Sequence, residues 1–421
     1  MKALILAGGF GTRLVHVVKD VPKPMAPVAG KPFLEYPLFS LKRQGITDIV
    51  LLTGHKSEMI ESHFGGGSKF GVKISYSVET SPLGTAGAIK RAVDVFGIGM
   101  DEQFLVLNGD TWFDIDFALF ESFHRNGNRA LSIALKYRED VRRYGAVKLR
   151  DDSIEGFIEK SPALGDGFIN GGIYMMTPAA LDGVEDGKAV SFETFVMPRL
   201  LEGKSSVGGI PFGGRFIDIG VPDDYYLADR ELPRWIERAS EKIRAAFLDR
   251  DGIIIEDSVY PHLPEHMKLV DGVVPFLKNV SEAGYRPIIV TNQAGIAKGV
   301  YGEQAYRAFH GAILDALERE GVGILDTFYC PFHPEAKIKA YRKESLLRKP
   351  EPGMILLAAD KHFVDVGRSF MVGDKQSDVI RLPYLKSYLL AGKYPLSGNG
   401  RVFDSFNTLW EKLNEEQNSP R

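Results

Sequence analysis

The chain has 421 residues, and at roughly 150 residues per domain this length predicts two or three domains. The 44% of hydrophobic and 25% of charged residues exclude wholesale disorder, and the net charge of −3 favours no nucleic-acid or membrane partner. Cys330 is the single cysteine, which excludes an intrachain disulfide, and no apolar run approaches the roughly 20 residues that span a bilayer. We therefore expect a cytoplasmic enzyme that acts on small molecules, and the sequence leaves a homo-oligomer open.

Short apolar runs alternate with segments of helical period in the first half of the chain. Leu34, Leu38 and Leu41, for example, recur at helical spacing between two such runs. This alternation predicts a mostly parallel α/β sheet, with an antiparallel insertion at 130–176, where strand-like pieces dominate. The predicted strands are Ala3–Leu6, Asp48–Thr53, Val72–Val78 and Phe104–Leu107.

A charged stretch at 232–244 separates this half from a second α/β series. We expect a nucleotide-handling domain at 1–232, a helical linker at 233–244 and a second domain at 245–415, with frayed residues at the end. The strands predicted for the second domain are Ala245–Leu248, Pro287–Val290, Phe328–Cys330, Phe370–Val372 and Tyr388–Leu390.

A glycine-rich loop follows the first predicted strand. Its glycines let the backbone approach a polyphosphate, and two cations nearby supply charge, although a bare turn would also carry glycines. The residues concerned are Gly8, Gly9, Gly11, Thr12, Arg13 and Lys23.

The run LAGGFGTRL, followed by KPM, resembles the signature of the sugar-1-phosphate nucleotidyltransferases. The resemblance continues over roughly residues 1–230 through PLGTAG, NGD, IEK, GIY and FIDIG. It implies a Rossmann-like sheet and an enzyme that joins a nucleoside triphosphate to a sugar 1-phosphate and releases pyrophosphate.

The same resemblance implies roles for individual residues. Arg13 and Lys23 would hold the triphosphate, and Asp110 and Asp218 would bind Mg²⁺, although a helix cap or a turn could also account for the two acids. The nucleotide site would further include Gly84, Asn108 and Gly109, while Glu159, Lys160 and Gly172 would bind the sugar phosphate.

Glu79 precedes PLGTAG by three residues and bears on the nucleobase. A carboxylate accepts two hydrogen bonds side by side, and guanine presents the adjacent donors N1–H and N2–H₂. The combination also resembles the guanylyltransferase branch of the family, which implies GTP as a substrate. A surface glutamate at the end of a strand is the alternative.

The second series begins with Asp249-Arg250-Asp251-Gly252 directly after a predicted strand. Two acids at this spacing can serve as nucleophile and proton donor at one phosphate, although DxD alone is a weak signal. Together with Thr291, Lys349 and Asp374 in that order, it resembles the haloacid-dehalogenase phosphatase superfamily.

The motifs FLDRDG, VTNQAGIAKG, CPFHP, RKPEPGM and MVGDKQSD resemble the branch of heptose-bisphosphate and histidinol-phosphate phosphatases over about 245–392. This implies a phosphoaspartate on Asp249, proton transfer by Asp251, and Thr291 and Lys349 holding the phosphoryl group. Mg²⁺ would bind to Asp249, the carbonyl of Asp251 and Asp374, and the substrate would contact Asn292 and Arg348.

Two features refine this interpretation. Only 39 residues separate Asp251 from Thr291, so we expect a Rossmannoid sheet without a cap domain and a specificity loop at Asp257–Tyr260. Many relatives carry a zinc loop, but Phe332 stands at the histidine position and only Cys330 of its cysteines remains, so we expect no zinc.

Removing one phosphate from a sugar bisphosphate leaves a sugar 1-phosphate, the substrate of the other half. The two resemblances thus imply consecutive steps on heptose phosphates towards GDP-heptose. Three alternatives stay open: a hexose 1-phosphate acceptor, a phosphatase for histidinol phosphate, and one half that only binds.

Overall fold

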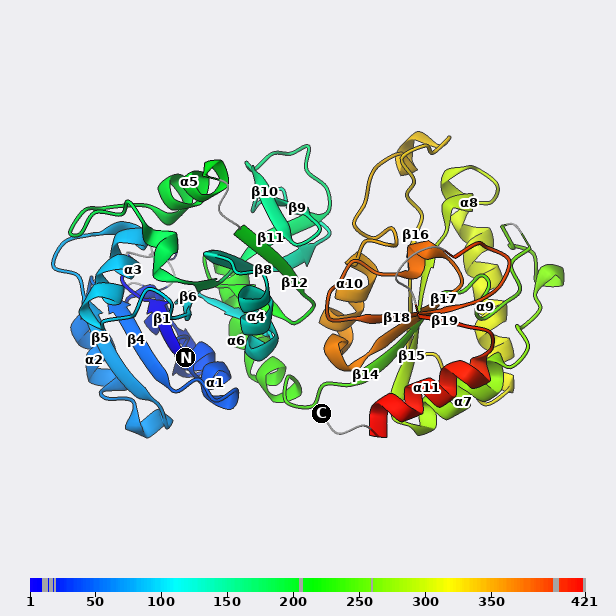
Figure 1. Ribbon diagram of the computed structural model, residues 1–421, viewed down its shortest axis with the longest axis horizontal. Helices are drawn as coiled ribbons and strands as arrows, with labels where there is room; N and C mark the ends of the chain where they lie inside the picture. Colours follow the sequence, from blue (N-terminus) through cyan, green and yellow to red (C-terminus); the bar gives the residue numbers. More distant parts are fainter. Residues whose placement is uncertain are drawn as a thin grey trace. The chain divides into compact units, whose positions relative to one another are not determined.

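The computed structural model describes residues 1–9, 14, 18, 20–203, 207–258, 260–396 and 401–418. These residues form two compact units, unit 1 (Met1–Ser240) and unit 2 (Glu241–Arg421). Both are α/β, and their elements are shown in Figure 1. No helix in the described ranges combines the length and the hydrophobicity that crossing a membrane requires.

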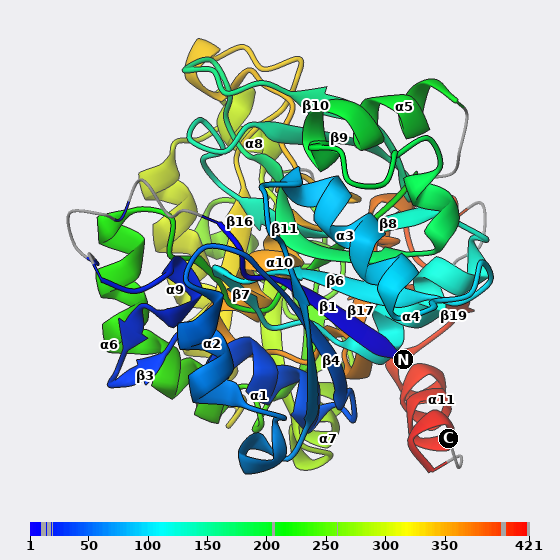
Figure 2. The same cartoon turned by 90° about the vertical axis from the view of Figure 1, so that its left-hand side faces the viewer.

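Unit 1 is built on a sheet that has nine strands in the described residues, in the order β5-β4-β1-β6-β11-β8-β12-β10-β9. Four of them, β5, β4, β1 and β6, run parallel and lie side by side in Figure 2. The antiparallel strands β8 to β11 confirm the predicted insertion. The strands are β1 (Lys2–Leu6), β2 (Pro27–Val28), β3 (Lys31–Pro32), β4 (Asp48–Thr53), β5 (Lys73–Val78), β6 (Phe104–Asn108), β7 (Thr111–Phe113), β8 (Leu131–Arg138), β9 (Ala146–Arg150), β10 (Ser153–Ile158), β11 (Gly167–Met176), β12 (Val207–Phe212) and β13 (Phe216–Asp218).

Helix α6 closes unit 1 and continues through residues 233–238, which the sequence placed in a linker. Trp235 of this helix stacks on Trp112 of β7, with ring centroids 6.4 Å apart, so packing holds these residues on unit 1. The helices of unit 1 are α1 (Glu35–Arg43), α2 (Ser57–Phe64), α3 (Gly84–Val95), α4 (Phe117–Asn126), α5 (Met197–Glu202) and α6 (Pro222–Arg238).

Unit 2 contains a parallel sheet of six described strands in the order β16-β15-β14-β17-β18-β19. Numbered within the unit this is 3-2-1-4-5-6, the doubly wound order, and α7, α9 and α11 pack on one face while α10 lies on the other (Figure 1). The elements are β14 (Arg244–Leu248), α7 (Val273–Glu282), β15 (Tyr285–Asn292), α8 (Ala294–Ala297), α9 (Glu303–Arg319), β16 (Asp326–Cys330), α10 (Gly353–His362), β17 (Phe370–Gly373), β18 (Lys386–Leu390), β19 (Arg401–Phe403) and α11 (Phe406–Asn418).

This strand order predicts where ligands bind in each unit. In an open α/β sheet the strand order reverses at a switch point, and ligands bind beyond the carboxyl ends of the strands there. The reversal lies between β1 and β6 in unit 1 and between β14 and β17 in unit 2. Between Asp251 and Thr291 the described residues form a loop and α7, with no additional domain.

Candidate active sites

A cavity of about 480 Å³ opens at the switch point of unit 1. Most of the residues that the sequence assigned to the nucleotide lie in its wall, whereas Gly11, Thr12 and Arg13 lie outside the described residues. The predicted residues in the wall are Gly8, Gly9, Lys23, Glu79, Gly84, Asn108, Gly109, Asp110 and Asp218.

Lys23 and two aspartates form the charged end of this cavity. The ammonium of Lys23 contacts Asp110 and lies 3.6 Å from Oδ1 of Asp218. Burial, together with the charge of Asp110, raises the pKa of Asp218, and Lys23 opposes this shift. Oδ1 of Asp218 has no hydrogen-bond partner among the described residues, and both carboxylates, which are hard oxygen donors suited to Mg²⁺, lie near the same ammonium.

Glu79 lies in the same cavity. Its Oε2 accepts the backbone N–H of Leu83 at 2.7 Å, which fixes the carboxylate at the start of α3. Burial raises the pKa of Glu79, and the Leu83 hydrogen bond and Arg91 oppose this. Gly84 follows with φ of +66°, where a Cβ would lie 2.6 Å from the carbonyl oxygen of Val190, so only glycine fits.

Of the residues predicted for the sugar phosphate, one lies next to the cavity and two lie outside its wall. Gly172 has φ of +70° and abuts the cavity residue Asn108, whose Nδ2 would lie 2.9 Å from an added Cβ. Glu159 and Lys160 follow β10, are exposed, and are not part of the cavity wall. Sequence reasoning missed Glu193, which lines the cavity and accepts a hydrogen bond from Ser191 at 3.1 Å.

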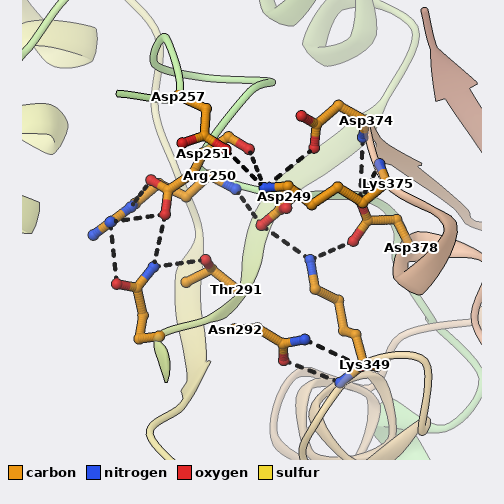
Figure 3. Close-up of polar contacts among 11 residues, drawn as sticks. Asp249, Arg250, Asp251, Asp257, Thr291, Asn292, Lys349, Asp374, Lys375 and Asp378 are labelled. Carbon is orange, nitrogen blue, oxygen red and sulfur yellow. Dashed lines mark hydrogen bonds and ion pairs between the residues drawn. The ribbon is translucent and has the colours of Figure 1, made fainter. Parts of the chain in front are cut away.

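Unit 2 has a cavity of about 280 Å³ at its own switch point, and Figure 3 shows the side chains around it. Asp249 follows β14 and Asp374 follows β17, as the motifs predicted. The predicted residues in the wall are Asp249, Asp251, Asn292, Arg348 and Lys349. Thr291 and Asp374 are buried beside this wall rather than part of it.

Lys349 is buried between two carboxylates. Its Nζ lies 2.9 Å from Oδ1 of Asp249 and 2.6 Å from Oδ1 of Asp378, as Figure 3 shows. Burial by itself would lower the pKa of Lys349, but the two carboxylates overcome it and raise that pKa. Asn292 donates to the carbonyl of Lys349 and accepts its N–H, so it positions this lysine, and its contact with substrate stays a prediction.

Three buried carboxylates could share a metal ion. One oxygen from each of Asp249, Asp374 and Asp378 lies within 4.8 Å of the others. Burial, reinforced by the neighbouring carboxylates, raises the pKa of Asp374 to about 7, and its Oδ1 has no hydrogen-bond partner among the described residues. This oxygen-rich donor set fits Mg²⁺. The sequence analysis missed Asp378, although its position four residues after Asp374 was a signal.

Neighbouring side chains hold the carboxylate of Asp251. Arg250 donates to it from Nε at 2.7 Å and from Nη2 at 3.1 Å, and Gln293 donates from Nε2 at 3.2 Å. Burial raises the pKa of Asp251, and these donors oppose that shift.

Lys298 and Arg348 supply positive charge around His333 in the cavity wall. Partial burial lowers the pKa of His333, and the charges of Arg348 and Lys298 lower it further.

Cys330 is buried, with its Sγ 3.8 Å from the carbonyl of Phe332, and the expected absence of zinc stays a prediction.

A family model described as "Nucleotidyl transferase" matches residues 2–234. The chain belongs to the nucleotidyl transferase family. D-glycero-alpha-D-manno-heptose 1-phosphate guanylyltransferase from Aneurinibacillus thermoaerophilus is 42% identical over 56% of this chain and 100% of its own. Mannose-1-phosphate guanylyltransferase from Mycobacterium tuberculosis is 34% identical over 56% of this chain and 65% of its own.

Solved structures give a consistent picture of unit 1. HddC from Yersinia pseudotuberculosis is 33% identical and covers 55% of this chain and 99% of its own, with a TM-score of 0.50. The family match ends before unit 2, so the account of unit 2 depends on its own geometry.

Proposed function

We propose that this protein is a bifunctional enzyme of sugar-nucleotide biosynthesis. Unit 2 removes the 7-phosphate of D-glycero-D-manno-heptose 1,7-bisphosphate, and unit 1 transfers a guanylyl group from GTP to the heptose 1-phosphate that results. For unit 1 the supporting observation is the cavity that holds Glu79 together with Lys23, Asp110 and Asp218. For unit 2 it is the burial of Lys349 between Asp249 and Asp378.

In unit 1 a phosphate oxygen of the sugar 1-phosphate attacks the α-phosphorus of GTP in line. A new P–O bond forms, the bond between the α-phosphorus and the bridging oxygen breaks, and pyrophosphate leaves. Lys23 binds the phosphates through its ammonium, and Asp110 and Asp218 would hold Mg²⁺. Mg²⁺ supplies charge neutralisation on the phosphate oxygens.

Glu79 supports guanine as the base. The Leu83 hydrogen bond occupies Oε2 once, so the carboxylate keeps acceptor capacity on both oxygens for the N1–H and N2–H₂ of guanine. Similarity to the heptose 1-phosphate guanylyltransferase, which is 42% identical, supports heptose 1-phosphate as the acceptor. Mannose 1-phosphate is the alternative acceptor, because a mannose-1-phosphate guanylyltransferase is also similar.

In unit 2 Asp249 attacks the phosphoryl group and forms a phosphoaspartate, which water then hydrolyses. Oδ1 of Asp249 accepts the N–H of Arg250 at 2.7 Å and faces Lys349, which leaves Oδ2 for the attack. Asp251 protonates the leaving alkoxide and then takes a proton from the water. Asp249, the carbonyl of Asp251 and Asp374 would hold Mg²⁺, whose charge offsets that of the phosphoryl oxygens.

The cations of the unit 2 cavity support a substrate with a second phosphate. Lys298 and Arg348 lie around His333 in one part of the wall, and their charges can bind an anion that is not hydrolysed. A bisphosphate therefore uses both parts of the cavity.

Phosphorus NMR tests both activities in one sample. The protein would be given Mg²⁺, the heptose 1,7-bisphosphate and equal amounts of four nucleoside triphosphates, with signals expected from phosphate, pyrophosphate and GDP-heptose. Asp249→Asn should abolish phosphate release and leave pyrophosphate release from added heptose 1-phosphate intact, and Asp110→Asn should do the reverse. Faster turnover of mannose 1-phosphate than of heptose 1-phosphate would refute the heptose assignment.

A further inference from the structure

The amide of Gln293 lies at the centre of a buried hydrogen-bond network. The residue is 1% exposed and follows β15 directly. Its Oε1 accepts from the hydroxyl of Tyr301 at 2.6 Å and from Nη2 of Arg250 at 3.1 Å. Its Nε2 donates to Oγ1 of Thr291 at 2.9 Å and to Oδ2 of Asp251 at 3.2 Å. Both donors and both acceptor positions of the amide are thus in use.

This pattern fixes which end of the amide faces which neighbour. The guanidinium of Arg250 can only donate, and the carboxylate of Asp251 accepts, so the oxygen must face Arg250 and the NH₂ group must face Asp251. In the opposite orientation the NH₂ group would face the donor Arg250, and the amide oxygen would face the carboxylate of Asp251, so both buried contacts would be lost. The NH₂ group therefore points to Thr291 and Asp251 permanently.

The two hydrogen bonds from Nε2 have different consequences. At Thr291 the hydroxyl oxygen acts as an acceptor, so its own hydrogen stays available for a phosphoryl oxygen at Asp249. At Asp251 the amide adds a third donor to the two from Arg250, so the carboxylate is held on both oxygens and cannot rotate freely. A primary amide can serve a hydroxyl and a carboxylate in this way, because it offers two donor hydrogens on one atom.

We infer that Gln293 is a positioning residue for the phosphatase reaction, an inference that rests on the proposed function of unit 2. It orients the hydroxyl of Thr291 as a donor and holds Asp251 for proton transfer.

Tyr301 extends the network to the substrate cavity. Its ring lines the cavity and stacks on His262 with centroids 5.1 Å apart, while its hydroxyl donates to Gln293. A substrate that contacts this wall is connected to Asp251 through two hydrogen bonds in series. We therefore expect Tyr301→Phe to weaken catalysis less than changes at Gln293, because Arg250 still donates to Oε1.

The decisive variant is Gln293→Glu, which keeps the shape but replaces the two donor hydrogens with a carboxylate. The glutamate would accept from Thr291, turn its hydroxyl hydrogen away from the phosphoryl group, and repel Asp251. Steady-state kinetics with p-nitrophenyl phosphate and with the heptose 1,7-bisphosphate should show kcat lowered by about 100-fold, as when one positioned donor is removed from an active site. KM should change by less than about threefold, because the cations of the wall are untouched.

Gln293→Met tests the same inference without adding a charge, in case the glutamate variant does not fold. The factor by which Gln293→Met lowers kcat should be at least about threefold smaller when Thr291 is already replaced by valine than in the wild type. Mutations within one hydrogen-bond network are not additive. Gln304→Glu, on an exposed position of α9, is the matched control and should leave kcat unchanged. Pyrophosphate release by unit 1 reports that each variant is intact elsewhere.

The outcomes separate the two claims. A wild-type protein without phosphate release would overturn the phosphatase and this inference with it. An active wild type combined with Gln293→Glu and Gln293→Met variants that keep kcat within about threefold, or lose activity only through KM, would overturn the inference alone. Additive effects of Gln293→Met and Thr291→Val would also overturn it.

Discussion

Replacing Asp378 by asparagine tests the buried ion pair that the sequence did not reveal. Asp378 is fully buried, and its Oδ2 accepts the N–H groups of Asp374 at 3.1 Å and Lys375 at 3.0 Å, while its Oδ1 faces Lys349 at 2.6 Å. An asparagine side chain has a single oxygen, which cannot accept from the backbone N–H groups and from Lys349 at the same time. Either the backbone donors or the lysine would then face an NH₂ group, and one buried interaction is lost in both orientations.

Breaking a buried pair by removing one partner costs about 3–5 kcal/mol. For a unit of this size each kcal/mol lowers the melting temperature by about 2–4 °C, so the unit 2 transition should fall by about 10 °C. Phosphate release should also fall, because Lys349 loses one of the two carboxylates that hold it. Unit 1 should keep its transition and its pyrophosphate release, since Asp378 pairs with Lys349, Asp374 and Lys375 of unit 2.

Scanning calorimetry with and without GTP and Mg²⁺ distinguishes the two transitions, because a ligand raises the stability of the unit that binds it. Glu256→Gln is the matched control. It removes an exposed ion pair with Lys268 in the same unit by the same change from carboxylate to amide, and it should shift the unit 2 transition much less because solvent screens this pair. An Asp378→Asn protein whose unit 2 melts within about 2 °C of the wild type would show that the pair contributes little, contrary to this reasoning.

Three further measurements address both units. Burial, and to a smaller extent the charge of Arg250, lowers the pKa of His310 from 6.5 to about 4. Between these two pH values His310 is protonated in the unfolded chain but neutral in the folded one. Unit 2 should therefore lose about 2 kcal/mol between pH 7 and 5 through this residue, and thermal melts of His310→Gln should show a smaller loss. Glu79→Gln should lower kcat/KM for GTP by about 10- to 100-fold and reduce the preference over ATP, measured as pyrophosphate release, because an amide offers guanine one acceptor instead of two. EDTA should stop phosphate and pyrophosphate release, and added Mg²⁺ should restore both; activity that survives chelation would contradict a magnesium requirement.

The sequence predicted best what local pattern determines. Short apolar runs marked β1, β14 and β17, and the polar residues directly after the last two, Asp249 and Asp374, must lie at the carboxyl edge of the sheet. The switch points could also be anticipated, because a parallel α/β sheet places its site at such edges. A few neighbouring residues determine where a strand ends, so the motifs could locate the residues that follow each strand.

Pairings across the chain could not be predicted in the same way. Lys349 meets Asp378 because the loop before α10 and the turn after β17 converge, and nothing in either motif specifies that distance. Gln293 stood inside a quoted motif, but its hydrogen bond to Tyr301 depends on the path of the chain between β15 and α9. Residues 233–238 continue α6, and the packing of Trp235 on Trp112 is a contact that local composition does not specify.

Both units place a lysine beside a group of carboxylates. A site that binds Mg²⁺ and phosphate must gather carboxylates, which repel one another when they are buried together. In unit 1 Lys23 lies beside Asp110 and Asp218, and in unit 2 Lys349 lies between Asp249 and Asp378. A lysine suits this position because its compact charge carries three donor hydrogens on a flexible stem, so it can hold two carboxylates and also contact an incoming phosphate. Under the proposed functions, the same cation would stabilise the acidic cluster and recruit the anion on which the cluster acts.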